Sequence, residues 1–442
     1  MAGKAIAYWK KTAYYLKRNG VKKTWYAVRE RLAARGTCPY QPPMLSADTW
    51  EKQREESASW DITFSVLVPA YRTGETYLRE MIDSLIGQSF LHWELVLADA
   101  TEDDSVKDIV ATYEEPRIRY VKLEHNAGIS ENTNQGLQHV TGEYVGLLDH
   151  DDVLTPDALY EMAKAIGEER DRGVQLQMLY SDEDKCNADM SEFYEPNFKE
   201  DFNPDMLLSN NYICHFLVMK KELMQSLQFR APYDGAQDFD LALRAMAELY
   251  DRQDRIYHIS KVLYHWRCHQ DSTAENPRSK LYAYEAGRRA IQDYADQRGW
   301  QAYVEETPHL GFYRLVYENG IFTNREQVGA VGGPVIVSGK IQGGRMDAEG
   351  NVYYRGTPKN YSGYLHRTIL SQTAVAVDIR RMQVREECRQ LFEQVVGVPY
   401  ITLQGTEMFD SSTLAAGSDY VALSLAFCQA LSAEGYEIVY MP

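Results

Sequence analysis

The sequence predicts an α/β fold in which a mostly parallel sheet is flanked by helices. Short apolar strands alternate with helices between residues 63 and 148, which is the pattern of a parallel sheet covered on both faces. Polar residues follow these strands directly, at the edge where parallel sheets bind ligands. Strands are expected at 63–69, 93–98, 118–123, 144–148 and 174–179, with helices at 76–88, 106–113 and 130–139.

Four segments are expected along the 442 residues, a length that suffices for two domains. They are a basic, aromatic helical extension (1–38), a polar linker (39–61), the α/β domain (62–304) and a smaller α/β domain (305–442). Within the extension, Asn19-Gly20 is expected to separate two short helices.

Charge is distributed unevenly along the chain. The net charge of −17 argues against a nucleic acid partner, because phosphate binding needs clustered Lys and Arg. The first 35 residues, however, contain ten Lys or Arg and a single acid, Glu30. Residues 1–35 therefore have two interpretations: a helix lying on an anionic membrane surface, or a helix packed on the protein with its basic side chains in water.

Localisation signals are sparse. No apolar run approaches the roughly 20 residues of a membrane span, and no secretory signal is evident. The six cysteines form no C-x-x-C pair, which favours reduced thiols. A cytoplasmic protein is expected, peripheral on the inner face of the membrane if the basic extension binds lipid.

The strongest local motif is the acidic turn after the strand at 144–148. Asp149 and Asp151 stand at alternating positions, so that their carboxylates can converge on one point. Such oxygen ligands suit Mg²⁺ or Mn²⁺, the ions that hold diphosphates in many transferases. The alternative is a solvated acidic turn that caps the next helix.

Two further strand ends carry candidate nucleotide contacts. Pro69-Ala70-Tyr71 forms a turn that can cup a flat base, and Asp99 can accept a hydrogen bond from a uracil or thymine imide. An Asp in this position is also a common turn or cap residue.

The loop before the helix at 130–139 is a candidate phosphate contact. Asn126 and Gly128 lie where a helix N-terminus would favour an anion. The simpler interpretation makes Ser130 the N-cap and Gly128 a turn residue.

Two later segments add acids. Residues Asp182, Glu183, Asp184 and Lys185 are expected in an acidic loop that follows the strand at 174–179. Asp238 begins an amphipathic helix, where it serves either as a cap or as a general base.

A strand that ends in His265-Trp266-Arg267 completes the candidate set. His265 can offer an imidazole to a metal, and Trp266 can offer an aromatic face to a sugar. Alternatively, His265 is a hydrogen-bonded core histidine.

In this order the motifs resemble the family 2 glycosyltransferases of the GT-A (Rossmann-like) fold, over about residues 62–304. The resemblance rests on Val68-Pro69-Ala70-Tyr71, Asp99, Asn126-x-Gly128, Asp149-x-Asp151 and Gln237-Asp238-Phe239-Asp240. Ser181-Asp182-Glu183-Asp184-Lys185 and Leu263-Tyr264-His265-Trp266-Arg267 resemble the bacterial branch that builds O-antigen and rhamnose-rich surface polysaccharides.

The resemblance implies an inverting, metal-dependent transfer of a hexosyl or rhamnosyl group from a UDP- or dTDP-linked donor to a glycan acceptor. A lipid-linked glycan is the acceptor that fits the basic N-terminal segment. The resemblance also implies donor contacts by Pro69, Ala70, Tyr71, Asp99, Asn126, Gly128 and Asp149, and metal contacts by Asp149, Asp151 and His265. Asp238 would be the catalytic base, with Asp182, Glu183, Asp184, Lys185, Trp266 and Arg267 on the acceptor side. Two departures are that Ala100, not an acid, follows Asp99, and that Gln237 replaces a usual acid.

Residues 305–442 resemble the acceptor-side part of a second GT-A domain, with residues 435–442 the nearest match. Ser424 and Ala426 fall where the base would lie, and Asp419 is a nearby acid. A degenerate domain that grips the acceptor or a partner, and a plain structural extension, are both compatible with this pattern.

For the whole chain the alternatives are a non-catalytic nucleotide-sugar-binding or scaffold protein, and a nucleotidyltransferase. The latter would need a Gly-rich basic phosphate loop, which does not precede Asp99.

Overall fold

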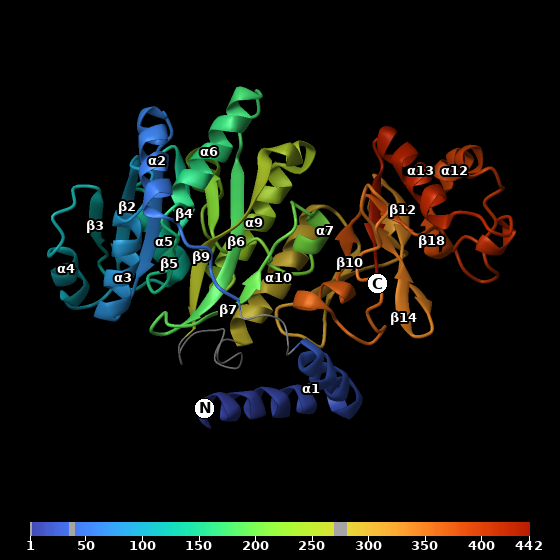
Figure 1. The fold of residues 1–442 in the computed structure, drawn as a ribbon, viewed down its shortest axis with the longest axis horizontal. Coiled ribbons are helices and arrows are strands. Elements are labelled where there is room, and N and C mark those ends of the chain that lie inside the picture. Colours follow the sequence, from blue (N-terminus) through green and yellow to red (C-terminus); the bar gives the residue numbers. More distant parts are fainter. Residues whose placement is uncertain (1, 35–39, 269–280) are drawn as a thin grey trace. The chain divides into compact units, whose positions relative to one another are not determined.

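The computed structural model describes residues 2–34, 40–268 and 281–442, and it divides into two compact units (Figure 1). The nine-stranded unit comprises Cys38–Phe202 and Asn211–Ala290. The C-terminal unit comprises Met1–Thr37, Asn203–Asn210 and Ile291–Pro442.

The nine-stranded unit is built on one sheet, with the strand order β3-β2-β1-β4-β8-β6-β9-β5 and with β7 paired to β6. The strands are β1 (Phe64–Ala70), β2 (Trp93–Asp99), β3 (Ile118–Lys122), β4 (Tyr144–Leu147), β5 (Val153–Leu154), β6 (Met178–Asn187), β7 (Phe193–Asn197), β8 (Leu217–Lys220) and β9 (Ile256–Cys268). β1 is parallel to β2 and β4, and β6 is parallel to β9. β8 runs antiparallel between β4 and β6. This topology confirms the predicted mostly parallel α/β sheet.

Helices cover both faces of this sheet. They are α2 (Ala47–Glu56), α3 (Glu75–Ile86), α4 (Ser105–Val110), α5 (Ile129–Leu137), α6 (Ala158–Asp171), α8 (Lys221–Leu227), α9 (Gln237–Glu248) and the first part of α10 (Leu281–Gln297). Val66 of β1 shares a buried core with Leu78 of α3 and Met162 of α6. Leu67 points the other way, so close to Gly136 of α5 that a Cβ there would lie 2.6 Å from its Cδ1. The alternation along β1 thus places helices on opposite faces.

The predicted linker at 39–61 contains a helix, α2, which begins because the Ser46 hydroxyl accepts a hydrogen bond from the backbone of Thr49. One expectation about local structure is wrong. The predicted acidic loop at 182–185 is instead the second half of β6, which runs on to Asn187. Its acids are accommodated in a strand because they find partners inside the unit, as shown below for Asp182 and Asp184.

The C-terminal unit has a smaller sheet with the order β16-β19-β12-β18. Its strands are β10 (Ala302–Glu306), β11 (Tyr313–Tyr317), β12 (Val328–Gly332), β13 (Val335–Val337), β14 (Lys340–Gly343), β15 (Arg345–Met346), β16 (Gln372–Thr373), β17 (Ala376–Val377), β18 (Met382–Val384) and β19 (Glu437–Tyr440). Its helices are α1 (Ala2–Ala34), α7 (Pro204–Leu207), α11 (Ile321–Asn324), α12 (Arg389–Val396) and α13 (Tyr420–Ala433). Phe392 of α12 and Phe427 of α13 pack into its core.

The N-terminal helix α1 is interrupted where the sequence predicted. Gly20 has φ 75° and ψ 172°, which is not helical, so that two helical segments meet there. Within the described residues, no helix has the length and apolar character that crossing a membrane requires.

Candidate active site

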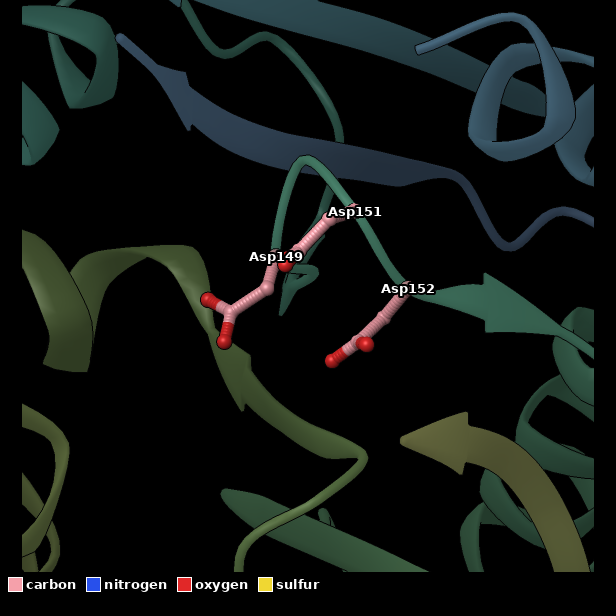
Figure 2. Close-up of side chains that lie close together, drawn as sticks. All are labelled: Asp149, Asp151 and Asp152. Atoms are coloured by element: carbon pink, nitrogen blue, oxygen red, sulfur yellow. The ribbon is translucent and has the colours of Figure 1, made fainter. Parts of the chain in front are cut away.

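The acidic turn lies between β4 and β5, at the edge of the sheet where β1, β2, β4, β6 and β9 end. Figure 2 shows Asp149, Asp151 and Asp152 leaving the same turn. One carboxylate oxygen from each lies within 4.8 Å of the others, the one such group of metal-ligand side chains found in the described residues. Three carboxylates this close repel one another, so a hard divalent cation fits the group chemically.

Asp152 has a structural role in this turn that the sequence did not predict. It is 1% exposed, and its two oxygens accept hydrogen bonds from the Tyr264 hydroxyl (2.5 Å) and the backbone N–H of Arg267 (2.7 Å). The buried Arg267 side chain also donates from Nε to the carbonyl of Asp151 at 2.6 Å. The end of β9 therefore fixes the turn that presents Asp149 and Asp151.

The electrostatics of the turn favour a bound cation. Burial raises the pKa of the Asp149 carboxyl; the charge of His215 lowers this pKa and that of Asp151 raises it, with a net increase. Burial likewise raises the pKa of Asp152 well above its usual value, with the charges of Asp151 and Asp149 adding to the effect. Positive charge placed among these groups would relieve the repulsion and keep the carboxylates ionised.

Asp238 lies in the first turn of α9, and the structure brings it together with Asp149. Both line a small cavity of about 60 Å³, to which Pro69 and His215 also contribute. The Asn211 side-chain amide donates a hydrogen bond to Oδ2 of Asp238 at 3.0 Å. The acid two residues later, Asp240, is buried instead.

Asp240 is neutralised by two arginines and does not line the cavity. Arg230 forms a bidentate ion pair with it, and Arg244 donates to its Oδ2 at 2.8 Å. The two acids that the sequence places in one motif thus have different surroundings: Asp238 faces the cavity, and Asp240 holds the helix to the preceding loop.

His215 lines the cavity but was missed by the sequence reasoning. Its ring stacks on Tyr264 with centroids 4.8 Å apart, and it lies 5.4 Å from the ring of Trp266. Its backbone N–H and its Nδ1 both contact the buried carboxylate of Glu183, with the Nδ1 distance at 3.2 Å. A signal did exist: His215 lies two residues before the apolar β8, and the start of this antiparallel strand lies at the same edge as the ends of its neighbours β4 and β6.

Glu183 and His215 form a charged pair next to the cavity. Burial alone would raise the pKa of Glu183, but Lys199 and His215 outweigh it and lower that pKa to about 2. Burial alone would lower the pKa of His215, but Glu183, followed by Asp149 and Asp152, raises it to about 9. His215 is therefore a cation at neutral pH, in a place that suits an anionic group.

Other predicted residues of β6 and β9 bond within the unit. Asp184 is buried and accepts a hydrogen bond from the Tyr40 hydroxyl at 2.9 Å, and it lies 2.5 Å from Nδ1 of His265. His265 is 8% exposed and is not one of the three grouped metal-ligand residues. Asp182 binds Nε2 of His258 at 2.9 Å.

Two predicted acceptor-side residues, Lys185 and Trp266, remain partly exposed. The Lys185 ammonium lies 5.5 Å from the centre of the Trp266 ring and pairs with Glu195 at 2.8 Å. Because Trp266 also neighbours His215, it connects this partly exposed pair with the cavity.

The predicted base contacts lie at the ends of β1 and β2. Asp99 is fully buried, and it accepts hydrogen bonds from the backbone of Thr101 (2.8 Å) and the Tyr120 hydroxyl (2.7 Å). The carbonyl of Ala70 accepts from the backbone N–H of Ala100, and the Tyr71 hydroxyl donates to Glu102 at 3.0 Å.

A hollow of about 460 Å³ lies at these strand ends. It is lined by Arg72, Thr73, Thr101, Glu102, Asp103 and Ser105. Asp99 itself is not one of the lining residues, so it supports this loop from below rather than facing the hollow.

The loop at Asn126 and Gly128 is closed by internal hydrogen bonds. Oδ1 of Asn126 accepts from the backbone of Gly128 (3.1 Å) and from the side chain of Asn132 (2.9 Å). The alternative interpretation, with Ser130 as the N-cap of α5, is wrong, because Gly128 holds that position with φ 97°. The backbone N–H of Ser130 donates instead to the carboxylate of Asp234 at 3.2 Å.

In the C-terminal unit, the acid near the expected second base position caps a helix. Asp419 accepts from the backbone N–H groups of Val421 and Ala422, both at 3.1 Å, at the start of α13. Ser424 is buried and accepts from the backbone of Ile379 at 2.9 Å.

Comparisons with known proteins identify the domain. Residues 65–227 match the model of the family described as Glycosyl transferase family 2. The chain therefore contains a family 2 glycosyltransferase domain, which confirms the family that the motifs resemble.

Similar proteins extend beyond that domain. An uncharacterized protein of Sinorhizobium fredii, y4gI, is 40% identical over 234 residues, which are 52% of this chain and 25% of that protein. The O-antigen biosynthesis protein RfbC of Myxococcus xanthus is 33% identical over 297 residues, 64% of this chain and 22% of that protein. This chain thus spans about a quarter of the length of these relatives. The solved structure of S. aureus TarS 1-349 in complex with UDP-GlcNAc is 20% identical, covers 53% of this chain and 66% of that chain, and has a TM-score of 0.43.

Proposed function

We propose that this chain is an inverting, metal-dependent glycosyltransferase that moves a hexosyl or rhamnosyl group from a nucleotide-diphosphate sugar to a glycan. The observation that carries the proposal is that Asp149 and Asp238 line one cavity. A metal-binding carboxylate and a candidate base thus meet at the edge of the sheet where family 2 motifs gather.

Asp149 and Asp151 are the proposed ligands of Mg²⁺ or Mn²⁺, because Asp152 is already held by two donors from β9. A divalent ion bound there would act as a Lewis acid on the departing diphosphate. Arg267 and Asp152 keep the turn in place, and the His215 imidazolium faces the same cavity as Asp149.

Asp238 is the proposed general base. In this role it removes the proton from the acceptor hydroxyl as that oxygen attacks the anomeric carbon from the face opposite the diphosphate, so that the anomeric configuration inverts. Asn211 orients the carboxylate through its hydrogen bond to Oδ2 of Asp238.

The remaining assignments follow the family pattern. Pro69, Ala70 and Tyr71, with Asp99 behind them, are proposed to receive the base of a UDP- or dTDP-linked donor, and Asn126 and Gly128 to lie beside its phosphates. Trp266 and Lys185 are proposed to meet the acceptor. His265 is proposed to support the metal site only indirectly, because its Nδ1 is engaged by Asp184.

The proposed pathway is the synthesis of a bacterial surface polysaccharide such as an O-antigen or rhamnan. Similarity to a protein named for O-antigen biosynthesis supports this context. A lipid-linked acceptor would bring the chain to the cytoplasmic face of the membrane, and the basic residues 1–35 are proposed to contact that surface.

Residues 305–442 are proposed to be a degenerate, non-catalytic domain that grips the acceptor or a partner. The C-terminal unit has a hollow of about 520 Å³, to which Arg314, Tyr317 and Arg381 contribute. Arginine and tyrosine side chains suit the hydroxyl and acidic groups of a glycan.

The test is donor hydrolysis by the full chain with a panel of UDP-, dTDP- and GDP-sugars, in Mn²⁺, Mg²⁺ or chelator. Metal-dependent release of a nucleoside diphosphate from one donor, absent in Asp238→Asn, supports the proposal. Metal-dependent donor binding with no turnover by the wild-type chain would favour a non-catalytic nucleotide-sugar-binding protein instead. In a separate reaction that supplies nucleoside triphosphates and sugar 1-phosphates instead of the donors, release of pyrophosphate would point to a nucleotidyltransferase.

A further inference from the structure

The second half of α1 has its polar face bound to the C-terminal unit. The Glu30 carboxylate accepts hydrogen bonds from the backbone N–H groups of Ser362 (3.0 Å) and Gly363 (2.5 Å). Tyr26, one turn before Glu30 on the same side, has its ring edge to face with that of Tyr361. The orientation of this helix about its own axis is therefore fixed by specific contacts.

The opposite face of the helix is apolar and exposed. Val21, Trp25, Val28 and Leu32 are 77%, 51%, 41% and 56% exposed. Their spacing of four, three and four residues places all four on one stripe of a helix. A surface helix of a globular protein has the reverse arrangement, with its apolar stripe inward and its polar face in water.

Exposed basic residues lie beside this stripe. Lys22 and Arg29 are exposed, and the Arg29 guanidinium lies 4.7 Å from the centre of the Trp25 ring. The rest of the chain is acidic enough to bring the net charge to −17. An anionic surface would therefore attract this helix while repelling the remainder of the protein.

We propose that residues 21–34 lie on an anionic phospholipid bilayer, with Val21, Trp25, Val28 and Leu32 inserted into the interface. The segment extends about 21 Å, parallel to the membrane. This proposal specifies the helix face and the class of lipid in the membrane contact of residues 1–35, and it therefore rests on that part of the proposed function. A single short stripe gives reversible binding, which the flanking positive charges strengthen.

The experiment is vesicle flotation of the full chain, with vesicles of phosphatidylcholine alone or mixed with phosphatidylglycerol. Three variants are compared: Trp25→Ser with Leu32→Ser, which removes apolar area; Lys22→Gln with Arg29→Gln, which removes charge; and Ile401→Ser as the control. Ile401 is 49% exposed and lies in the C-terminal unit outside α1, so it matches the stripe residues in exposure. Circular dichroism of each variant verifies that its helical content is unchanged.

The wild-type chain and Ile401→Ser should float with the phosphatidylglycerol vesicles. The apolar pair should lower the partition coefficient by at least about tenfold. The charge pair should lower it by about fivefold for each charge, and salt should reduce binding in parallel. Wild-type binding by the apolar variant, or self-association through the stripe without vesicle binding, would overturn the proposal.

Donor hydrolysis measured without vesicles separates this proposal from the proposed chemistry. A chain that hydrolyses donor but does not float retains the proposed transferase activity and loses only the membrane contact. A chain that floats through the stripe but releases no nucleoside diphosphate retains the membrane contact and lacks the proposed transferase activity.

Discussion

The Asn211 side chain donates a hydrogen bond to Asp238 at 3.0 Å, joining the segment before β8 to the first turn of α9. This contact holds Asp238 at the cavity that Asp149 also lines. Asp240, two residues further along α9, is instead held between Arg230 and Arg244. Two acids of one short motif are thus assigned to chemistry and to stability by their surroundings.

Substituting each of these acids should separate the two roles. Asp238→Asn keeps the shape of the side chain and should lower kcat by about 10²- to 10⁴-fold, with donor affinity and unfolding free energy nearly unchanged. Asp240→Asn should lower the unfolding free energy by about 3 kcal/mol, because it leaves two arginines without their buried partner. Kinetics, donor titration and urea unfolding measure these effects. Full turnover by Asp238→Asn would remove it as the base.

Divalent ions should stabilise the chain through the acidic turn. At a free Mn²⁺ concentration of a hundred times its Kd, binding to the folded state alone adds about 2.7 kcal/mol to the unfolding free energy. Asp151→Asn should lose most of this gain and the metal-dependent donor hydrolysis. Thermal unfolding with Mn²⁺ or chelator checks it. An equal Mn²⁺ gain in wild type and Asp151→Asn would place the metal elsewhere.

Gly128→Ala should lower the unfolding free energy more than the same substitution at a glycine that has free space where the Cβ would lie. Gly128 has φ 97°, and a Cβ there would lie 2.5 Å from an oxygen of Asp234. Gly173, with φ 84°, has no heavy atom within 4 Å of that position, so Gly173→Ala costs only the backbone strain of about 1 to 2 kcal/mol. Urea unfolding should show the larger loss for Gly128→Ala. When Gly128→Ala is introduced into Asp234→Ala and compared with Asp234→Ala alone, the loss should fall to that of Gly173→Ala. Equal losses at both glycines would mean that Asp234 moves aside freely.

Acid should destabilise the C-terminal unit through His309 and His366, whose rings stack 3.5 Å apart. Burial lowers the pKa of His309 from 6.5 to about 4 and that of His366 to about 3. Since the unfolded chain binds these protons first, the stabilisation is complete above pH 6.5 and is lost as the pH falls toward 4. The loss reaches at most about 1.4 kcal/mol per pH unit and histidine.

The measurement for this pair is urea unfolding between about pH 7.5 and 4.5, the range over which histidine titrates. His366→Gln should reduce the pH dependence of the unfolding free energy while leaving the contributions of the carboxylates in place. A pH dependence as steep in this variant as in the wild type would assign the acid sensitivity to other groups.

Asp419→Ala tests whether the C-terminal unit carries a second catalytic acid. Loss of the two hydrogen bonds to Val421 and Ala422 should lower the unfolding free energy by about 1 kcal/mol. Donor hydrolysis below the unfolding transition should be unchanged, because the residue acts as a helix cap. Loss of turnover in a folded Asp419→Ala chain would contradict a non-catalytic role.

Much of the nine-stranded unit follows from the sequence because its signals are local. The apolar runs of β1, β2 and β4 and the acidic turn at Asp149 are each contained in a few neighbouring residues. The continuation of β6 was not predictable in this way. Asp182 and Asp184 look like loop residues until His258, His265 and Tyr40, all distant in the sequence, supply their partners.

The sequence by itself determined the family, the parallel sheet and the order in which polar residues follow its strands, because periodicity and short motifs depend on adjacent residues. Only the tertiary structure decided that His215 and Asn211 belong with Asp238, since an antiparallel strand brings its beginning to the edge where parallel strands end. It also decided which face of α1 is outward. A helical stripe is visible in the sequence, but its direction depends on Glu30 meeting Ser362, more than three hundred residues away.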